Sequence, residues 1–452
     1  MAAISAITFE DLFGERKLVQ LLHPDRARKH NYEATIITGQ NGSHKSTLLK
    51  QIVAVLGPLA NQPKFDELVD TKGDLSGCSL LCISGSPADR FPQKGLSSGA
   101  RTAYDIPSYA YVGQRLMGNL LSRKAPLETV LSFALAPQKA KRYSWDFFRK
   151  AHAHAGIKPT VHCTFNTKNQ LVKSNLDLRE GLQSLNPADD ERKHKDRDAP
   201  RVSYAMAQWL LNEFDEQEFK ILEELMVSRP SGQFKARLSI EGAESNRGSP
   251  NVLRLGLLLD VLRLGDVRVQ SVRSGNEFSL FDLSSGEYHM YLTMLAVGFG
   301  VEEETVLLID EPENHLHPQW QRDLMASVFE VFSQVRSKGQ IIVSTHSPLI
   351  VGSAPDGTSV VDLTYDEPLT SLVSYGASSD ELLLTNFGVG SSRNRVVVDT
   401  IQRAINFVER GDFSNSDFLA LAPNLKLIRK ALTPSDPMIE VVDALLAEGQ
   451  IQ

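Results

Sequence analysis

The chain has few cysteines, no excess of basic charge and no long apolar run. Its three cysteines, Cys78, Cys82 and Cys163, are too few and too scattered for a disulfide framework and indicate a reducing compartment. Lysine and arginine total 48 against 55 aspartate and glutamate, so the overall charge does not attract a polyanion such as nucleic acid. No run approaches the roughly 20 apolar residues of a membrane span, and the amino terminus lacks a secretory pattern. We therefore expect a cytoplasmic protein without membrane partners.

The first motif is a glycine-rich loop between a predicted strand and a predicted helix. The apolar, β-branched run at 34–39, "ATIITG", predicts a buried strand, and "KSTLLKQIVAVLG" at 45–57 predicts a helix that ends at Gly57. Between them, "GQNGSHKS" matches the phosphate-loop pattern G-x-x-x-x-G-K-[ST], except that His44 replaces the second glycine. Strand, loop and helix in this order are the context that a phosphate-binding loop needs.

The exceptional residue, His44, is compatible with such a loop. Glycine is usual there because the backbone turns tightly and its N–H groups approach the phosphates. Histidine is among the few other residues that tolerate left-handed dihedral angles. Lys45, Ser46 and Thr47 remain to contact the β- and γ-phosphates and to place a hydroxyl on magnesium. We expect ATP binding to survive and hydrolysis to be slow.

One predicted helix start and three predicted strand ends accompany the loop. Ser284 and Glu287 have capping-box spacing, so a predicted helix begins at Ser285 and Gly286 with an anion-binding end. The buried strand 306–309 ends in Asp310, placed to hold magnesium, and Glu311, placed to polarise an attacking water.

The remaining two candidates follow other strands. The apolar run "QIIVS" delivers His346 to the edge of the sheet where Asp310 is expected. Gln114 closes the predicted strand 108–114 and is a candidate to bridge magnesium and water. Carboxyl ends of parallel strands share one edge of a sheet, which is where ligands bind in open α/β folds.

These five motifs occur in the order found in the ATP-binding-cassette (ABC) ATPases. The chain resembles that family, and within it the branch of the structural-maintenance-of-chromosomes (SMC) and DNA-repair ATPases. The resemblance implies an α/β fold: an ABC-type P-loop ATPase head with a mixed sheet flanked by helices, a helical insertion and a helical C-terminal tail. It implies ATP and Mg²⁺ as cofactors, and a head-to-tail homodimer, or a higher oligomer, in which Ser285 and Gly286 of one subunit cover the nucleotide of the other.

The resemblance also assigns roles to single residues. The catalytic set is Glu311, His346 and Gln114, and the magnesium set is Ser46, Asp310 and Gln114. The nucleotide-binding set joins the phosphate loop to the signature of the partner head and comprises Gly39, Asn41, Gly42, Ser43, His44, Lys45, Ser46, Thr47, Ser285 and Gly286.

The same alignment of motifs divides the chain into four parts. Residues 1–130 and 275–365 would be the two halves of the head, with a mostly helical insertion at 131–274 and a helical partner-docking tail at 366–452. The insertion has neither the heptads nor the length of SMC coiled-coil arms. A strongly periodic helix is expected from Val202 to about Met226, and a helix capped by Ser144 from there to Ala155.

The tail leaves two functions open. Its opening, "SYGASSDELLLTNFGVGSSRN", resembles the ATPase subunits of two-gene bacterial anti-phage systems, Septu among them. That resemblance implies a separately encoded HNH nuclease as partner, nucleic-acid contact through the complex, and no nuclease activity in this chain. The alternative is an ATP-hydrolysing DNA-repair or overcoming-lysogeny-defect ATPase that acts directly on DNA, suggested by "FVERGD" at 407–412, although Arg410 interrupts its acidic motif.

Overall fold

The structure is a computed structural model of the 452-residue chain. No helix in the part of the chain that it describes is long and apolar enough to cross a membrane. The residues that it describes are 3–26, 29–57, 68–75, 77–93, 103–116, 120–167, 177–187, 202–228, 234–335, 338–364, 367–373, 382, 384, 394–412, 415–432, 436 and 438–448.

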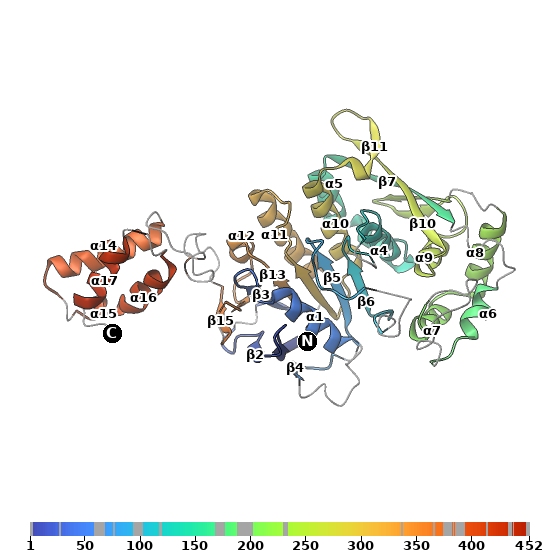
Figure 1. Ribbon diagram of the computed structural model, residues 1–452. Helices are drawn as coiled ribbons and strands as arrows, with labels where there is room; N and C mark the ends of the chain where they lie inside the picture. Colours follow the sequence, from blue (N-terminus) through green and yellow to red (C-terminus); the bar gives the residue numbers. More distant parts are fainter. Residues whose placement is uncertain are drawn as a thin grey trace.

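A seven-stranded sheet of order β15-β14-β3-β13-β12-β5-β6 forms the centre of the molecule (Figure 1). Its strands are parallel except for the edge strand β15, which pairs antiparallel with β14. Most are short apolar runs without alternation, as expected for strands buried on both faces. The strands are β3 (Glu33–Thr38), β5 (Ser79–Ser84), β6 (Tyr109–Val112), β12 (Thr305–Asp310), β13 (Gln340–Ser344), β14 (Ser359–Asp362) and β15 (Leu369–Leu372).

Helices cover both faces of this sheet, and successive strand residues point to different cores. Ile37 packs into the core shared with α1 (Lys45–Leu56), whereas its neighbour Ile36 packs into the core on the opposite face. The opposite face is covered by α10 (Ser285–Gly300), α11 (Pro318–Val335) and α12 (Pro348–Gly352) (Figure 1). The predicted fold class, a mixed sheet flanked by helices, is therefore confirmed.

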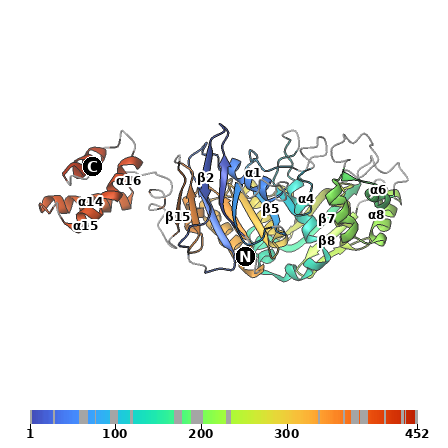
Figure 2. The ribbon, with the colours of Figure 1, turned by 90° about the horizontal axis from the view of Figure 1, so that it is seen from below.

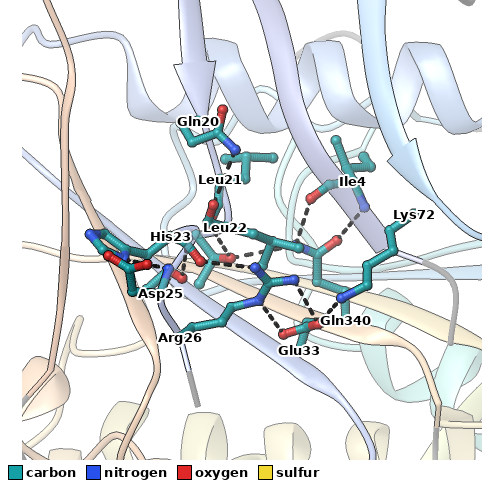
Figure 3. A network of polar contacts seen from close by, with 12 residues as sticks. Ile4, Gln20, Leu21, Leu22, His23, Asp25, Arg26, Glu33, Lys72 and Gln340 are labelled. Atoms are coloured by element: carbon teal, nitrogen blue, oxygen red, sulfur yellow. Dashed lines mark hydrogen bonds and ion pairs between the residues drawn. The ribbon is translucent and has the colours of Figure 1, made fainter. Parts of the chain in front are cut away.

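A smaller antiparallel sheet, of order β2-β1-β4, packs on the α1 side. It comprises β1 (Ala3–Glu10), β2 (Arg16–Gln20) and β4 (Val69–Lys72). Figure 3 shows how polar side chains join it to the central sheet: the Glu33 carboxylate accepts hydrogen bonds from Arg26 at 2.8 Å and Lys72 at 3.3 Å. Nearby, the amide of Gln340 pairs with the backbone of Ile4. These buried contacts lie at the amino ends of β3 and β13, opposite the edge where the predicted site residues gather.

Strands within residues 157–279 form a second sheet, which the expected mostly helical insertion at 131–274 did not include. Five antiparallel strands have the order β11-β10-β7-β8-β9. They are β7 (Ile157–Thr167), β8 (Phe234–Ser239), β9 (Gly242–Ser245), β10 (Leu262–Ser271) and β11 (Glu277–Ser279). The expectation of a mostly helical segment missed this sheet because its central pairing joins residues about a hundred positions apart, such as Cys163 and Val267.

Helices pack around this second sheet and join its core to that of the head. The predicted helix 202–226 is in fact two helices, because Phe214 is extended and Asp215 separates them. Trp145, not Ser144, is the N-cap residue before Asp146, and the helix ends at His154, with Ala155 as C-cap and Gly156 after it at a φ of 64°. The helical segments are α4 (Ala125–Ala134), η2 (Pro137–Ser144), α5 (Asp146–His154), α6 (Leu178–Gln183), α7 (Tyr204–Glu213), α8 (Glu216–Ser228), α9 (Pro250–Leu258) and η4 (Leu280–Asp282).

The C-terminal region is helical, as predicted (Figure 2). It has its own apolar core. Its helices are α14 (Arg395–Glu409), α15 (Ser416–Ala420), α16 (Ala422–Ala431) and α17 (Met438–Glu448). The string "FVERGD" is the end of α14, with Arg410 as C-cap and Gly411 at a φ of 72°. A helix terminus therefore accounts for the letters that suggested an acidic nuclease motif. The opening of the tail, 374–393, lies mostly outside the described residues.

Candidate functional site

The register of the central sheet brings the predicted motifs to one edge. Asp310 at the end of β12 pairs with Ser84 of β5 on one side and with Ser344 of β13 on the other. Ser344 in turn pairs with Ile37, two residues before Gly39. The segments that follow β3, β12 and β13 therefore leave the sheet side by side. This is the carboxyl edge, where open parallel sheets bind ligands.

The phosphate loop has the turn geometry that its pattern predicts. Gly39 and Gly42 have φ values of 144° and 87°, and His44 has a φ of 68° and a ψ of 21°, which is left-handed. The expectation that histidine can adopt this conformation is confirmed. A Cβ at Gly39 would lie 2.6 Å from Ser43 Oγ, so glycine is required there, whereas a Cβ at Gly42 would meet no described atom within 4 Å.

The lysine of this loop is buried under it. Lys45 is 5% exposed, and its ammonium donates hydrogen bonds to the carbonyls of Gly39, at 3.0 Å, and Gln40, at 3.2 Å. Burial lowers the pKa of Lys45, while the carboxylates of Glu311 and Asp310 act to raise it. A buried cation held at the start of a helix is the arrangement that binds phosphate oxygens.

A triphosphate fits the groups that line the loop. Helix α1 begins at Lys45, so the N–H groups of its first turn and its dipole favour an anion. The buried hydroxyl of Ser43 has no hydrogen-bond partner among the described residues, and a phosphate oxygen would supply one. The exposed Asn41 and Gly42 and the partly buried His44 surround the same loop. ATP would therefore rest on backbone N–H groups, the Ser43 hydroxyl and the Lys45 ammonium.

Asp310 and Ser46 provide hard oxygen ligands beside that loop. The Asp310 side chain is 1% exposed and accepts hydrogen bonds from the hydroxyls of Ser344 and Ser46. Burial raises the pKa of Asp310 to about 6 despite those bonds. A buried carboxylate next to a P-loop hydroxyl suits Mg²⁺, which takes few protein ligands and keeps its remaining positions for water and phosphate. These two residues would hold the ion, which would neutralise phosphate charge.

Glu311 and His346 face each other across the strand ends. The Glu311 carboxylate lies 3.7 Å from Nε2 of His346 and accepts a hydrogen bond from the Asn314 amide at 2.8 Å. His346 Nδ1 lies 3.5 Å from the Lys45 ammonium. Burial and Lys45 lower the pKa of His346, while Glu311 acts to raise it. A carboxylate so placed can accept a proton from water, and the imidazole can orient it.

Gln114 lies at the same edge but not beside Asp310. Val112 of β6 pairs with Ile83 of β5, so Gln114 leaves the sheet at the level of Gly85. Strand β6 is two strands from β12, about 10 Å away at the usual spacing between strands. The Gln114 carbonyl accepts a hydrogen bond from Ser122 N at 2.8 Å, just after the strand. The structure therefore places Gln114 on the site's rim.

Ser285 and Gly286 begin helix α10, as predicted. Ser284 is the N-cap, and it forms a reciprocal capping box with Glu287. In this chain Gly286 packs against the segment after β12: a Cβ on it would lie 2.5 Å from the carbonyl of His315. The sequence thus located the signature helix and its first residues correctly.

Two contacts near the loop were not predicted from the sequence. The ring of Phe13, 84% exposed at the tip of the β1–β2 hairpin, lies 5.7 Å from the imidazole of His44. Glu313 accepts a hydrogen bond from His346 N at 2.6 Å, and its other carboxylate oxygen is buried without a partner among the described residues. Phe13 belongs to no spaced motif, and its only signal was an aromatic residue within the turn-forming stretch "DLFG". Glu313 follows the acidic pair Asp310 and Glu311 closely, but that pattern does not predict its contact with His346.

The loop, the acidic strand end and the histidine on one parallel sheet define a P-loop ATPase of ABC and SMC type. The chain belongs to the family described as "AAA domain, putative AbiEii toxin, Type IV TA system", whose match spans residues 34–352. That span contains every residue predicted for the site.

Two relatives are similar to part of the chain. "Septu protein PtuA" of Bacillus thuringiensis is 32% identical over 106 residues, which are 22% of this chain and 26% of that protein. "Retron Vc95 probable ATPase" of Vibrio cholerae serotype O1 biovar El Tor is 32% identical over 95 residues, 18% of this chain and 17% of that protein. The matched segment spans no more than 26% of either relative.

Solved structures with a distant likeness cover most of the chain. An Smc head domain of Pyrococcus furiosus bound to the C-terminal domain of ScpA has 14% identity and a TM-score of 0.34, over 83% of this chain and 97% of that one. A putative metal-chelate type ABC transporter in an inward-facing conformation has 12% identity and a TM-score of 0.32, over 87% of this chain and 93% of that one.

Proposed function

We propose that the chain is the ATP-binding ATPase subunit of a bacterial anti-phage defence complex, and that its nucleotide state controls a separately encoded HNH nuclease. The observation that carries the proposal is the convergence of Lys45, Glu311 and His346, which makes one nucleotide site rather than scattered motifs. The likeness to Septu protein PtuA and to the retron ATPase supports the defence role. The complex would act in the cytoplasm, where ATP is available.

Different residues of the site would bind ATP, hold Mg²⁺ and activate the attacking water. The loop from Gly39 to Thr47 would bind the triphosphate, and Ser46 and Asp310 would hold Mg²⁺, with Gln114 approaching from the rim of the site. Glu311 would accept the proton of the attacking water while His346 orients it. The left-handed His44, with Phe13 against its ring, would place an imidazole beside the γ-phosphate and slow this step.

Two heads would pair head to tail around ATP. The start of α10 offers backbone N–H groups at Ser285 and Gly286, which suit the phosphates on the partner's loop. ATP would therefore favour the closed dimer, and loss of ATP would favour an arrangement that frees the nuclease. Residues 1–130 and 275–365 would form the head, the insertion at 131–274 would flank it, and the tail at 366–452 would dock the nuclease.

Glu311→Gln separates sensing from turnover. If nucleotide occupancy controls the nuclease, the variant keeps the ATP-bound state and the nuclease stays repressed when ATP is added. If turnover drives function, the variant loses control of the nuclease in the presence of ATP. Glu303→Gln is the matched control, because Glu303 is an exposed carboxylate paired with Lys338 on the surface.

The assay is plasmid cleavage by this chain together with the HNH nuclease that the proposal requires. We expect ATP to suppress cleavage by the wild type and by Glu311→Gln, and removal of ATP to release it. Cleavage that is the same with and without ATP would refute control by nucleotide state.

A further inference from the structure

We propose that His289 is a positioning residue through which the signature helix α10 holds the turn that carries Glu311. This inference rests on the role proposed above for Glu311. His289 lies one turn after Ser285 on α10, so a single helix would contact the partner's nucleotide and support this subunit's own carboxylate.

The link is a buried hydrogen bond to the residue after Glu311. Nε2 of His289 lies 3.2 Å from the carbonyl oxygen of Pro312. Because a carbonyl only accepts, the bond requires the tautomer with a proton on Nε2. His289 is 8% exposed, and burial lowers its pKa to about 4, so the ring is a neutral donor at pH 7. If the Pro312 carbonyl moves away, the buried Nε2–H group is left without an acceptor and without water, which costs free energy.

A glycine allows this approach. A Cβ on Gly85, at the end of β5, would lie 2.2 Å from the Glu311 carbonyl oxygen and 3.3 Å from Nε2 of His289. The backbone N–H of Gly85 also donates to Asp310 O at 2.9 Å. Strand β5, the imidazole and the Glu311 peptide therefore meet at one point where no side chain fits at position 85.

The turn that His289 supports is strained. Glu311 and His315 are non-glycine residues with φ values of 51° and 65°. Such conformations cost about 1–3 kcal/mol each and persist only where the surroundings hold them. Besides the His289 bond, Glu311 N donates to Ser344 O at 3.0 Å, and Gly286 packs on His315 O. Two of these supports, His289 and Gly286, belong to α10, so the position of this helix determines the position of the turn.

The consequence is a mechanical link between the two sites of a dimer. A shift of α10 on contact with the partner's nucleotide would move His289 and, through Pro312, the backbone of Glu311. At the other end of the turn, the Asn314 amide donates a hydrogen bond to the Glu311 carboxylate and holds it in place. Loss of the His289 bond should therefore misplace the carboxylate without touching the loop that binds ATP.

The test compares two nearly isosteric replacements in the full-length chain. His289→Met removes the donor, whereas His289→Gln keeps an N–H near the position of Nε2. We expect His289→Met to lower single-turnover ATP hydrolysis by about 10-fold or more and to leave the ATP dissociation constant within about 2-fold. His289→Gln should restore most of the rate.

The matched control is His152→Met. His152 is also buried: its Nδ1 donates to Phe148 O at 2.7 Å, and its Nε2 accepts from the hydroxyl of Tyr291 at 3.2 Å. Tyr291 lies two residues after His289 and therefore on the opposite face of α10. This variant should lose thermal stability as His289→Met does, yet keep the wild-type hydrolysis rate. Gly85→Ala is the second variant: its Cβ should displace the Glu311 carbonyl and lower the rate with ATP affinity retained, even if His289→Met fails to fold.

The inference is overturned if folded His289→Met hydrolyses ATP at the wild-type rate, if glutamine restores nothing, or if His152→Met loses as much rate. Should His289→Met not fold, a wild-type rate in Gly85→Ala overturns it. Glu311→Gln measured alongside separates this failure from that of the proposed function. If Glu311→Gln hydrolyses ATP normally, the assigned role of Glu311 is wrong; if only Glu311→Gln is inactive, the role stands and the link to α10 is wrong.

Discussion

The ammonium of Lys45 lies 3.5 Å from Nδ1 of His346, although the two residues are 301 positions apart. The phosphate loop and the segment after β13 therefore form one site, with Glu311 on the other side of the imidazole at 3.7 Å. Burial lowers the pKa of both Lys45 and His346, and the carboxylate of Glu311 acts to raise the pKa of both. This small cluster is the point at which ATP binding and its hydrolysis would be joined.

Lys45→Met should abolish tight ATP binding. The substitution keeps most of the buried volume but removes the only charge that the loop itself directs at the phosphates. It also leaves the nearby carboxylates of Asp310 and Glu311 without a counter-charge. We expect the dissociation constant for a fluorescent ATP analogue to rise about 100-fold or more. Lys50→Ala, on the exposed face of the same helix, should bind like the wild type.

Asp310→Asn should remove the effect of magnesium. The amide keeps the shape of the side chain but lacks the charge that a hard cation prefers. For the wild type we expect EDTA to weaken ATP binding and to stop hydrolysis, and for the variant we expect the same low activity with and without EDTA. Asp362→Asn, at the end of β14 on the same edge, should still respond to magnesium. An Asp310→Asn protein that magnesium stimulates normally would contradict the assignment.

The stability of the fold should fall in acid because of buried neutral histidines. Burial lowers the pKa of His152 to about 4 from its ordinary 6.5, so the unfolded chain takes up a proton first as the pH falls. Stability is therefore full above about pH 6.5 and is lost progressively towards pH 4. Between pH 7 and 4.5 this one group should cost about 2 kcal/mol in the free energy of unfolding.

Urea unfolding at the two pH values measures that cost. His152→Gln should lose less stability on acidification than the wild type by about this amount. His154→Gln, at the exposed end of the same helix, should show the wild-type pH dependence. An equal pH dependence in all three proteins would mean that His152 does not titrate as its burial requires.

The sequence predicted the elements that local patterns specify. Strand β3, helix α1 with its end at Gly57 and the capping box of Ser284 all lie where expected, because each depends on neighbouring residues. The left-handed conformation of His44 was predicted from the tight turn that a phosphate loop requires. Motif spacing located the acidic strand end and His346, since consecutive parallel strands of such a fold end at one edge.

What the sequence did not predict depends on contacts between distant segments. The five-stranded sheet pairs β7 with β10 across about a hundred residues. The residue pattern of each strand does not indicate which strand it pairs with. The contacts of Phe13 with His44 and of His289 with Pro312 arise only once β1 and α10 are packed. A lone histidine within an apolar helix is more often a core residue, so its pattern alone could not assign it a role.

The role proposed for His44 is to make this head a slow ATPase that senses nucleotide. The most direct test measures ATP affinity and ATP turnover for the wild type and for His44→Gly. Glycine adopts the φ of 68° at no steric cost, so the loop should keep its shape and lose only the imidazole. We expect tight binding in both proteins, slow turnover in the wild type and a rate at least about 10-fold higher in the variant. Ordinary turnover by the wild type, with no change on substitution, would contradict it.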